Sequence, residues 1–240
     1  EPNLLIPFGV EEIGGYEALA PARQMHLYNS AQNRHGEGTP LMGGRSILSS
    51  LIARSKIIDM LNVKYLITSV DRFSYGYIEY LDGVRFRPVY SNELVIFENH
   101  SVFPRAFVVS RAKTIRNAPD LLKRLLGADF DPRKEVLLEK DVRQIPPIPG
   151  NPTPAQVRFL LYEPERSILE VAGPGGFLVV SDAFHPGWRA RVDGKEAPLH
   201  RANYVMRAVE LPPGKHRIEF EFKPAAFRVG IWISIISLLV

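Results

Sequence analysis

The sequence predicts an α+β protein, in which an N-terminal mixed α/β domain precedes a small antiparallel β-sandwich of the immunoglobulin-like or jelly-roll-like kind. Helical and strand patterns alternate up to residue 139, a proline-rich segment follows, and strand patterns alone then continue to residue 224. The chain has 240 residues, 45% hydrophobic and 23% charged, which suits ordinary globular domains with a proper core. We expect domains at 1–148 and 152–224, followed by the start of a membrane helix at 225–240.

The N-terminal domain is predicted from local patterns, taken in chain order. Residues 1–40 are rich in turn-forming residues and are expected to be irregular. Ser46 begins a helical pattern of apolar residues that Asn62 closes. A second helix is expected after an N-cap at Asn117, with leucines along one face and Gly127 at its end. Strand patterns lie at 63–68, 75–80, 84–90, 94–98, 106–110 and 135–139.

A proline-rich segment separates the two predicted domains. Residues 145–154 contain five prolines in ten positions, which excludes a helix or a central strand. We expect a stiff extended spacer here. Six or seven short strands follow, with Asp193-Gly194 as a hairpin turn and alternating apolar and charged residues on either side of it. The strand patterns lie at 157–162, 167–171, 177–181, 188–192, 197–199, 204–211 and 218–222.

The chain ends in an apolar run. Residues 229–240 carry no charge, and apolar residues fall on every face of a helix drawn through them. Twelve residues span only about 18 Å as a helix, whereas a bilayer core needs about 30 Å. We interpret the run as the outer half of a transmembrane helix, with Trp232 near the interface and Arg228 beside the headgroups. A buried C-terminal helix or strand is the alternative. On this interpretation the chain is a piece of a longer protein.

Composition excludes several functions. The chain has no cysteine, which excludes disulfides, thiolate zinc sites and cysteine nucleophiles. Its net charge is +4, but the basic residues are dispersed, so nucleic-acid binding is not expected. The six histidines show no metal-ligand spacing, and no G-x-S-x-G nucleophile motif is present. We therefore expect no metal, no cofactor and no catalytic residue in this chain.

A glycine-rich segment at 36–46 is a poor match to a phosphate-binding loop. Gly44 stands where the loop's lysine would be, and no strand pattern precedes the segment. A helix cap at Ser46 is the preferred interpretation. Anion binding at the start of that helix is the alternative.

The segment 182–188 is the richest candidate for ligand binding. Asp182, His185 and Trp188 give a turn with a carboxylate, an imidazole and an indole, which suit hydrogen bonding and stacking on a sugar. Arg201 and Tyr204, with Asn203 between them, are expected to join the segment across the sheet. The alternative is structural: Trp188 begins an inward-facing alternation and would then belong to the core.

An ordered series of motifs resembles the C-terminal end of the YfhO family of bacterial polytopic membrane proteins. The resemblance covers nearly the whole chain, and its strongest part is residues 178–224. The motifs there are Leu-Val-Val-Ser-Asp at 178–182, His-Pro-Gly-Trp-Arg-Ala at 185–190, Val-Asp-Gly-Lys at 192–195, Arg-Ala-Asn-Tyr at 201–204, Arg-Ala-Val at 207–209, Pro-Gly-Lys-His at 213–216, Glu-Phe at 219–220 and Phe-Lys-Pro at 222–224. Upstream segments at 15–16, 62–68 and 103–107 also resemble the family.

The resemblance implies a setting for the chain. Members of the family carry a multi-helix membrane region similar to the large GT-C glycosyltransferases, which use polyprenyl-phosphate sugars outside the cytoplasmic membrane. Some are linked to glycosylation of envelope polymers such as teichoic acid. The chain would then be an extracytoplasmic region before the last membrane helix. The acidic catalytic residues of such enzymes lie in loops of the membrane region, so none can be assigned here.

We therefore expect an accessory or acceptor-positioning module for cell-envelope glycosylation, with its own transmembrane region and a polyprenyl-linked sugar or envelope polysaccharide as partners. A non-catalytic structural or protein-interaction domain, packing on the membrane region, is the alternative. A stand-alone soluble enzyme is a third interpretation, and it requires ionisable groups that converge in one deep pocket.

Overall fold

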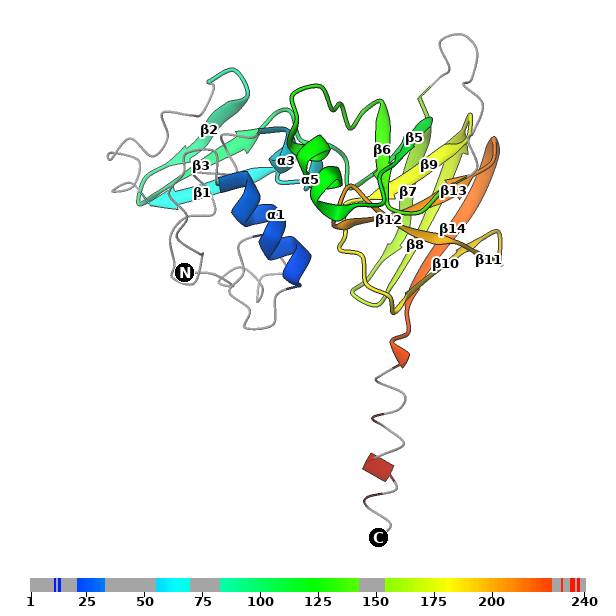
Figure 1. Cartoon of the computed structure of the whole chain (residues 1–240). Helices are drawn as coiled ribbons and strands as arrows, with labels where there is room; N and C mark the ends of the chain where they lie inside the picture. Colours follow the sequence, from blue (N-terminus) through cyan, green and yellow to red (C-terminus); the bar gives the residue numbers. More distant parts are fainter. Residues whose placement is uncertain are drawn as a thin grey trace. The chain divides into compact units, whose positions relative to one another are not determined.

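The computed structural model is mostly β-structure and divides into two compact units (Figure 1). It describes residues 11, 13, 21–32, 55–69, 83–142, 154–225, 230, 234, 235 and 237. The first unit contains residues 1–105 and 126–128, and the second contains residues 106–125 and 129–240.

The first unit contains a three-stranded antiparallel sheet. Its strands β1 (Tyr65–Ser69), β2 (Phe86–Ser91) and β3 (Leu94–Asn99) take the order β1-β3-β2. The predicted strands at 63–68, 84–90 and 94–98 are confirmed, while the one predicted at 75–80 lies outside the described residues. Helix α3 (Ser55–Met60) lies within the range 46–62 that was predicted to be helical, and residues 46–54 lie outside the described residues.

Helix α1 (Ala22–Gln32) corrects the prediction that residues 1–40 are irregular. The helix contains no glycine or proline, and it buries Leu27, Tyr28 and Ala31, which lie on one side of it. The prediction was wrong because polar residues occupy most other positions, so the apolar pattern is faint. The glycine-rich segment at 36–46 lies outside the described residues.

The second unit is a sandwich of two sheets. The six-stranded sheet has the order β4-β9-β13-β12-β6-β5, and the five-stranded sheet has the order β11-β10-β14-β8-β7. All of its described strand pairs are antiparallel except β5 with β6. The strands are β4 (Ala106–Val109), β5 (Arg111–Thr114), β6 (Glu135–Leu138), β7 (Gln156–Tyr162), β8 (Arg166–Gly173), β9 (Gly176–Val180), β10 (Trp188–Val192), β11 (Lys195–Ala197), β12 (Leu199–Ala202), β13 (Met206–Leu211) and β14 (Gly214–Phe222).

The predicted boundary at 148–152 is corrected by this arrangement. Strand β4 pairs along its length with β9, and β6 pairs with β12, so residues 106–142 complete the six-stranded sheet. The division between the two units falls after Arg105. Residues 143–153, which hold most of the proline-rich stretch, lie outside the described residues, and the described chain on both sides of them belongs to the second unit.

The core of the sandwich lies between its two sheets. Phe220 of β14, Leu169 of β8 and Val209 of β13 are fully buried in one cluster. Helix α5 (Ala118–Leu126) belongs to this unit up to Leu125, and the predicted cap at Asn117 is confirmed, because its Oδ1 accepts the Asp120 amide hydrogen at 3.1 Å.

The predicted membrane helix at 225–240 lies mostly outside the described residues. The positions that are described there, 225, 230, 234, 235 and 237, are helical and exposed. Over the part of the chain that the structure describes, no helix is both long enough and apolar enough to cross a bilayer.

Candidate functional site

The loop between β9 and β10, residues 181–187, carries the predicted ligand-binding segment. Backbone hydrogen bonds fix it at both ends. The Phe184 amide donates to the Val205 carbonyl at 2.7 Å, and the Trp188 amide donates to the His185 carbonyl at 3.0 Å. The Lys223 amide donates to the Gly187 carbonyl at 2.7 Å, which ties the loop to the chain beyond β14.

Gly187 shows how closely this loop approaches β14. A Cβ atom at this position would lie 2.9 Å from the Phe222 ring and 3.0 Å from Cα of Pro224. A side chain at this position would force the Phe222 ring and Pro224 to shift, so glycine favours the close approach of the loop. The glycine of the motif His-Pro-Gly-Trp therefore serves the packing of the loop against β14.

Asp182 is engaged by a buried arginine. The Arg207 side chain, 2% exposed, donates from Nη2 to Oδ2 of Asp182 at 2.6 Å. Asp182 also accepts a hydrogen bond from the Tyr162 hydroxyl at 3.1 Å. A buried guanidinium is costly without a counter-charge, so the position of this carboxylate is set by the need to balance Arg207.

Trp188 belongs to the same cluster. The Arg207 guanidinium carbon lies 3.9 Å from the Trp188 ring centroid and 5.0 Å from that of Phe220. Trp188 is half-buried and also contacts Phe222, with ring centroids 5.2 Å apart. One face of the indole is therefore occupied by a cation, an arrangement in which charge and ring quadrupole attract.

His185 is the exposed member of the loop. Its Nδ1 accepts the Gly187 amide hydrogen at 2.9 Å, and its ring packs edge-on against Phe222 at 5.3 Å between centroids. Because Nδ1 acts as the acceptor, the neutral ring carries its hydrogen on Nε2.

Arg201 reaches the predicted segment through Phe184, whereas Tyr204 does not take part in an exposed site. The Arg201 guanidinium lies 4.4 Å from the Phe184 ring centroid, and its Nε is 3.7 Å from Oε2 of Glu139. Tyr204 is only 2% exposed and stands in the turn between β12 and β13, so its ring is not presented to solvent. The structure thus joins Asp182 and Trp188 through Arg207, and brings His185 beside them through Phe222.

The residue that sequence reasoning missed is Arg207. It was part of a family-like motif but was not proposed as a site residue. The signal was present in the sequence: Arg207 interrupts the run Met206, Ala208, Val209, all of them buried. A charge inside such a run is almost never buried without a partner, and Asp182 at the end of the neighbouring strand pattern was a candidate.

A second polar pair joins β14 to the turn between β10 and β11. His216 Nδ1 and Asp193 Oδ2 are 2.7 Å apart, and Asp193 Oδ1 accepts the Arg217 amide hydrogen at 2.9 Å. The hydrogen bond to Asp193 raises the pKa of His216. The same hydrogen bond lowers the pKa of Asp193.

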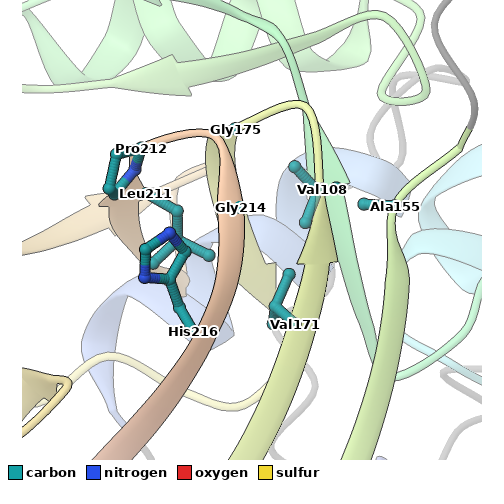
Figure 2. Close-up of a pocket in the computed structure, with 9 residues that line it drawn as sticks. Val108, Ala155, Val171, Gly175, Leu211, Pro212, Gly214 and His216 are labelled. Atoms are coloured by element: carbon teal, nitrogen blue, oxygen red, sulfur yellow. The ribbon is translucent and has the colours of Figure 1, made fainter.

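His216 also lines a small hollow at the edge of the sandwich (Figure 2). The hollow encloses about 180 Å³ including open solvent, and it has no interior space for even one water molecule. Apart from His216, its lining is glycine, proline, alanine, valine and leucine, so ionisable groups do not converge there. It offers no place for a substrate.

Metal binding has no support in the described residues. Nowhere in them do three or more histidine, aspartate or glutamate side chains gather in a way that could hold an ion.

The fold and the contacts of Arg207 with Asp182 and Trp188 define a β-sandwich domain in which the loop 181–187 is held by internal contacts. Residues 173–234 match the model of a family described as bacterial membrane protein YfhO, which confirms the predicted resemblance over these residues. The match covers β9 to β14 together with the loop 181–187. No curated protein and no solved structure matches this chain.

Proposed function

We propose that this chain is the extracytoplasmic C-terminal region of a bacterial integral membrane protein resembling lipid-linked-sugar glycosyltransferases, in which the β-sandwich is a non-catalytic structural domain packed beside the membrane region. The family match supports association with a membrane protein. The uncharged run at 229–240 supports attachment through the C-terminal end of the chain.

One observation carries the structural role: Arg207 engages both residues best suited to bind a sugar. Its guanidinium bonds to Asp182 at 2.6 Å and covers a face of Trp188 at 3.9 Å. Sugar recognition needs a carboxylate with free acceptor positions and an uncovered aromatic face. This carboxylate and this indole instead neutralise and cover a buried cation.

The location can be tested in cells because the chain has no cysteine. Lys195, an exposed residue at the start of β11, would be changed to cysteine in the full protein, with any cysteine outside this chain replaced by serine. A membrane-impermeant maleimide should label Lys195→Cys in intact spheroplasts. Labelling only after lysis would overturn the extracytoplasmic placement.

An acceptor-positioning role is the second candidate, and one observation favours it. Tyr162 is 41% exposed and bonds to Asp182, and His185 is exposed on the same loop as that carboxylate. These two side chains could hold a polyprenyl-linked sugar or an envelope polysaccharide from outside the cluster.

Glycan binding by the whole chain separates the two candidates. The structural role predicts that no envelope saccharide is retained on an array. Retention that is lost in both His185→Ala and Tyr162→Phe would replace it with the acceptor-positioning role. Retention that survives both substitutions would contradict both candidates, since the sugar would then bind elsewhere.

A further inference from the structure

One end of the sandwich gathers the loop 182–187 and residues 222–224 at the end of β14. The Gly187 carbonyl accepts the Lys223 amide hydrogen, and a Cβ at Gly187 would lie 2.9 Å from the Phe222 ring and 3.0 Å from Pro224. Strand β14 runs toward this end, where its last residue is Phe222 (Figure 1). The loop and residues 222–224 therefore lie side by side.

The turn between β7 and β8 belongs to the same end. The Phe222 amide donates to the Glu165 carbonyl at 2.8 Å, and Glu163, Pro164 and Glu165 are all exposed. We call this surface the exit end and define it as residues 163–165, 182–187 and 223–225. All of these residues lie in the second unit.

The chemistry of the exit end is mixed rather than basic. Exposed carboxylates stand at Glu163 and Glu165, while His185 presents an Nε2 hydrogen, and Lys223 is paired with Glu221 at 2.7 Å. The Phe222 ring packs against His185. Carboxylates with nearby hydrogen-bond donors complement a headgroup that carries both an ammonium and a phosphate.

We propose that the exit end contacts the headgroup layer of zwitterionic phospholipid, with His185 donating from Nε2 to phosphate oxygens. This inference rests on the proposed function, because it requires residues 229–240 to enter the bilayer beside this surface. Contact with protein segments of the membrane region, in place of lipid, is the competing outcome.

The geometry of β14 supplies a matched control. Lys215 stands near the opposite end of this strand, with its side chain 71% exposed, seven residues before Phe222. Seven residues of antiparallel strand span about 24 Å, so a label at Lys215 lies far above a bilayer that touches the exit end. Pro186 is the position of the test label, because it is exposed on the loop and its substitution retains His185.

The experiment compares two spin labels in the full-length protein. Pro186→Cys and Lys215→Cys would be labelled separately and reconstituted in phosphatidylcholine and phosphatidylethanolamine vesicles that contain a nickel-chelating lipid. We expect nickel to enhance relaxation several-fold more at position 186 than at position 215. Equal enhancement, or greater enhancement at 215, would overturn the proposal.

Two controls separate this proposal from the proposed function. If carbonate washing releases the protein from membranes, the proposed function itself fails. If the protein resists carbonate but the label at position 186 shows no relaxation enhancement, only the lipid contact fails, and a motionally restricted label would indicate protein packing instead.

The role of His185 is tested by adding a second substitution to Pro186→Cys. His185→Ala should reduce the relaxation enhancement at position 186, whereas His185→Gln, which keeps an N–H donor, should preserve it. An unchanged enhancement in the alanine variant would overturn the role of His185.

Discussion

Arg207 and Trp188 stack inside the sandwich, with the guanidinium carbon 3.9 Å from the indole ring centroid. The pair joins the two sheets, because Arg207 lies on β13 of one and Trp188 on β10 of the other. Asp182 completes the arrangement from the loop that leads into β10. The loop 181–187 is thus attached to the core through the Asp182 carboxylate, the Arg207 guanidinium and the Trp188 ring.

Replacing Trp188 by an aliphatic residue should destabilise the domain more than replacing it by a smaller aromatic residue. Trp188→Leu removes the ring face from a largely desolvated guanidinium and is expected to cost about 2–3 kcal/mol of unfolding free energy. Trp188→Phe keeps a ring in place and should cost about 1 kcal/mol. Urea denaturation of the whole chain, followed by circular dichroism, measures both. Equal losses in the two variants would show that the cation–ring contact is unimportant.

Gly176 should not tolerate a side chain. Its φ of 131° is unfavourable for other residues, and a Cβ would lie 2.5 Å from the Val109 carbonyl oxygen. We expect Gly176→Ala to lose at least about 3 kcal/mol of stability, since strain and a backbone clash add together.

Gly194 is the matched control for this substitution. Its φ is 78°, but no atom lies within 4 Å of the position of a Cβ. Gly194→Ala should therefore cost only about 1 kcal/mol, the backbone strain alone. Similar losses of stability for both variants in thermal denaturation would contradict the close approach of β4 and β9 at Gly176.

Asn203 should be sensitive for two separable reasons. It is fully buried with a φ of 45°, and its Oδ1 accepts the Leu137 amide hydrogen at 3.0 Å. Asn203→Gly keeps the left-handed backbone but leaves that amide unsatisfied, which should cost about 1–3 kcal/mol. Asn203→Ala adds backbone strain of about 1 kcal/mol. Chemical denaturation should rank alanine below glycine, and the reverse order would contradict the turn geometry.

The His216–Asp193 pair should stabilise the fold within a limited pH window. The raised pKa of His216 adds stability below its usual value of 6.5, and this contribution is lost as the pH rises through the folded pKa. The lowered pKa of Asp193 adds stability above its usual value of 3.8, and this contribution is lost as the pH falls through the folded pKa. The pair therefore contributes most between these two reference values.

An NMR titration of the His216 ring tests this coupling. In Asp193→Asn the pKa of His216 should fall, because the partner that favours the charged imidazole is gone. The stability difference between the two proteins should also shrink as the pH rises from 6 to 8. A histidine pKa that does not change on substitution would refute the coupling. His200 offers an internal comparison, since burial lowers its pKa and its titration should not respond to Asp193.

Local patterns predicted much of the sandwich but not its extent. Asp193 and Gly194 have φ values of 51° and 78°, as expected for the predicted two-residue hairpin turn. Strands β7 to β10, β13 and β14 overlap the predicted ranges because alternation and turn residues mark them locally. The single strand predicted at 197–199 is wrong, since β11 and β12 are separate strands that belong to different sheets. The pairing of β4 with β9 joins segments about 70 residues apart, and no local pattern encodes such a contact.

The candidate site shows the same division between local and distant information. Asp182, His185 and Trp188 were proposed as site residues because they are clustered in the sequence. Arg207 was missed because its contacts with Asp182 and Trp188 depend on how two sheets pack, which spacing along the chain does not reveal. Tyr204 was predicted as a ligand-binding residue from its type, yet the turn that contains it places it in the interior.

A double-mutant cycle on Asp182 and Arg207 tests the structural role of the loop most directly. Asp182→Asn leaves the buried guanidinium without its counter-charge and should cost about 3–5 kcal/mol, while Arg207→Met supplies an apolar side chain of similar length. We predict that Asp182→Asn costs far less in the Arg207→Met background, so that the coupling energy from urea denaturation exceeds about 1.5 kcal/mol. Additive losses would contradict the account, because Asp182 would then be free of Arg207 and available for a ligand.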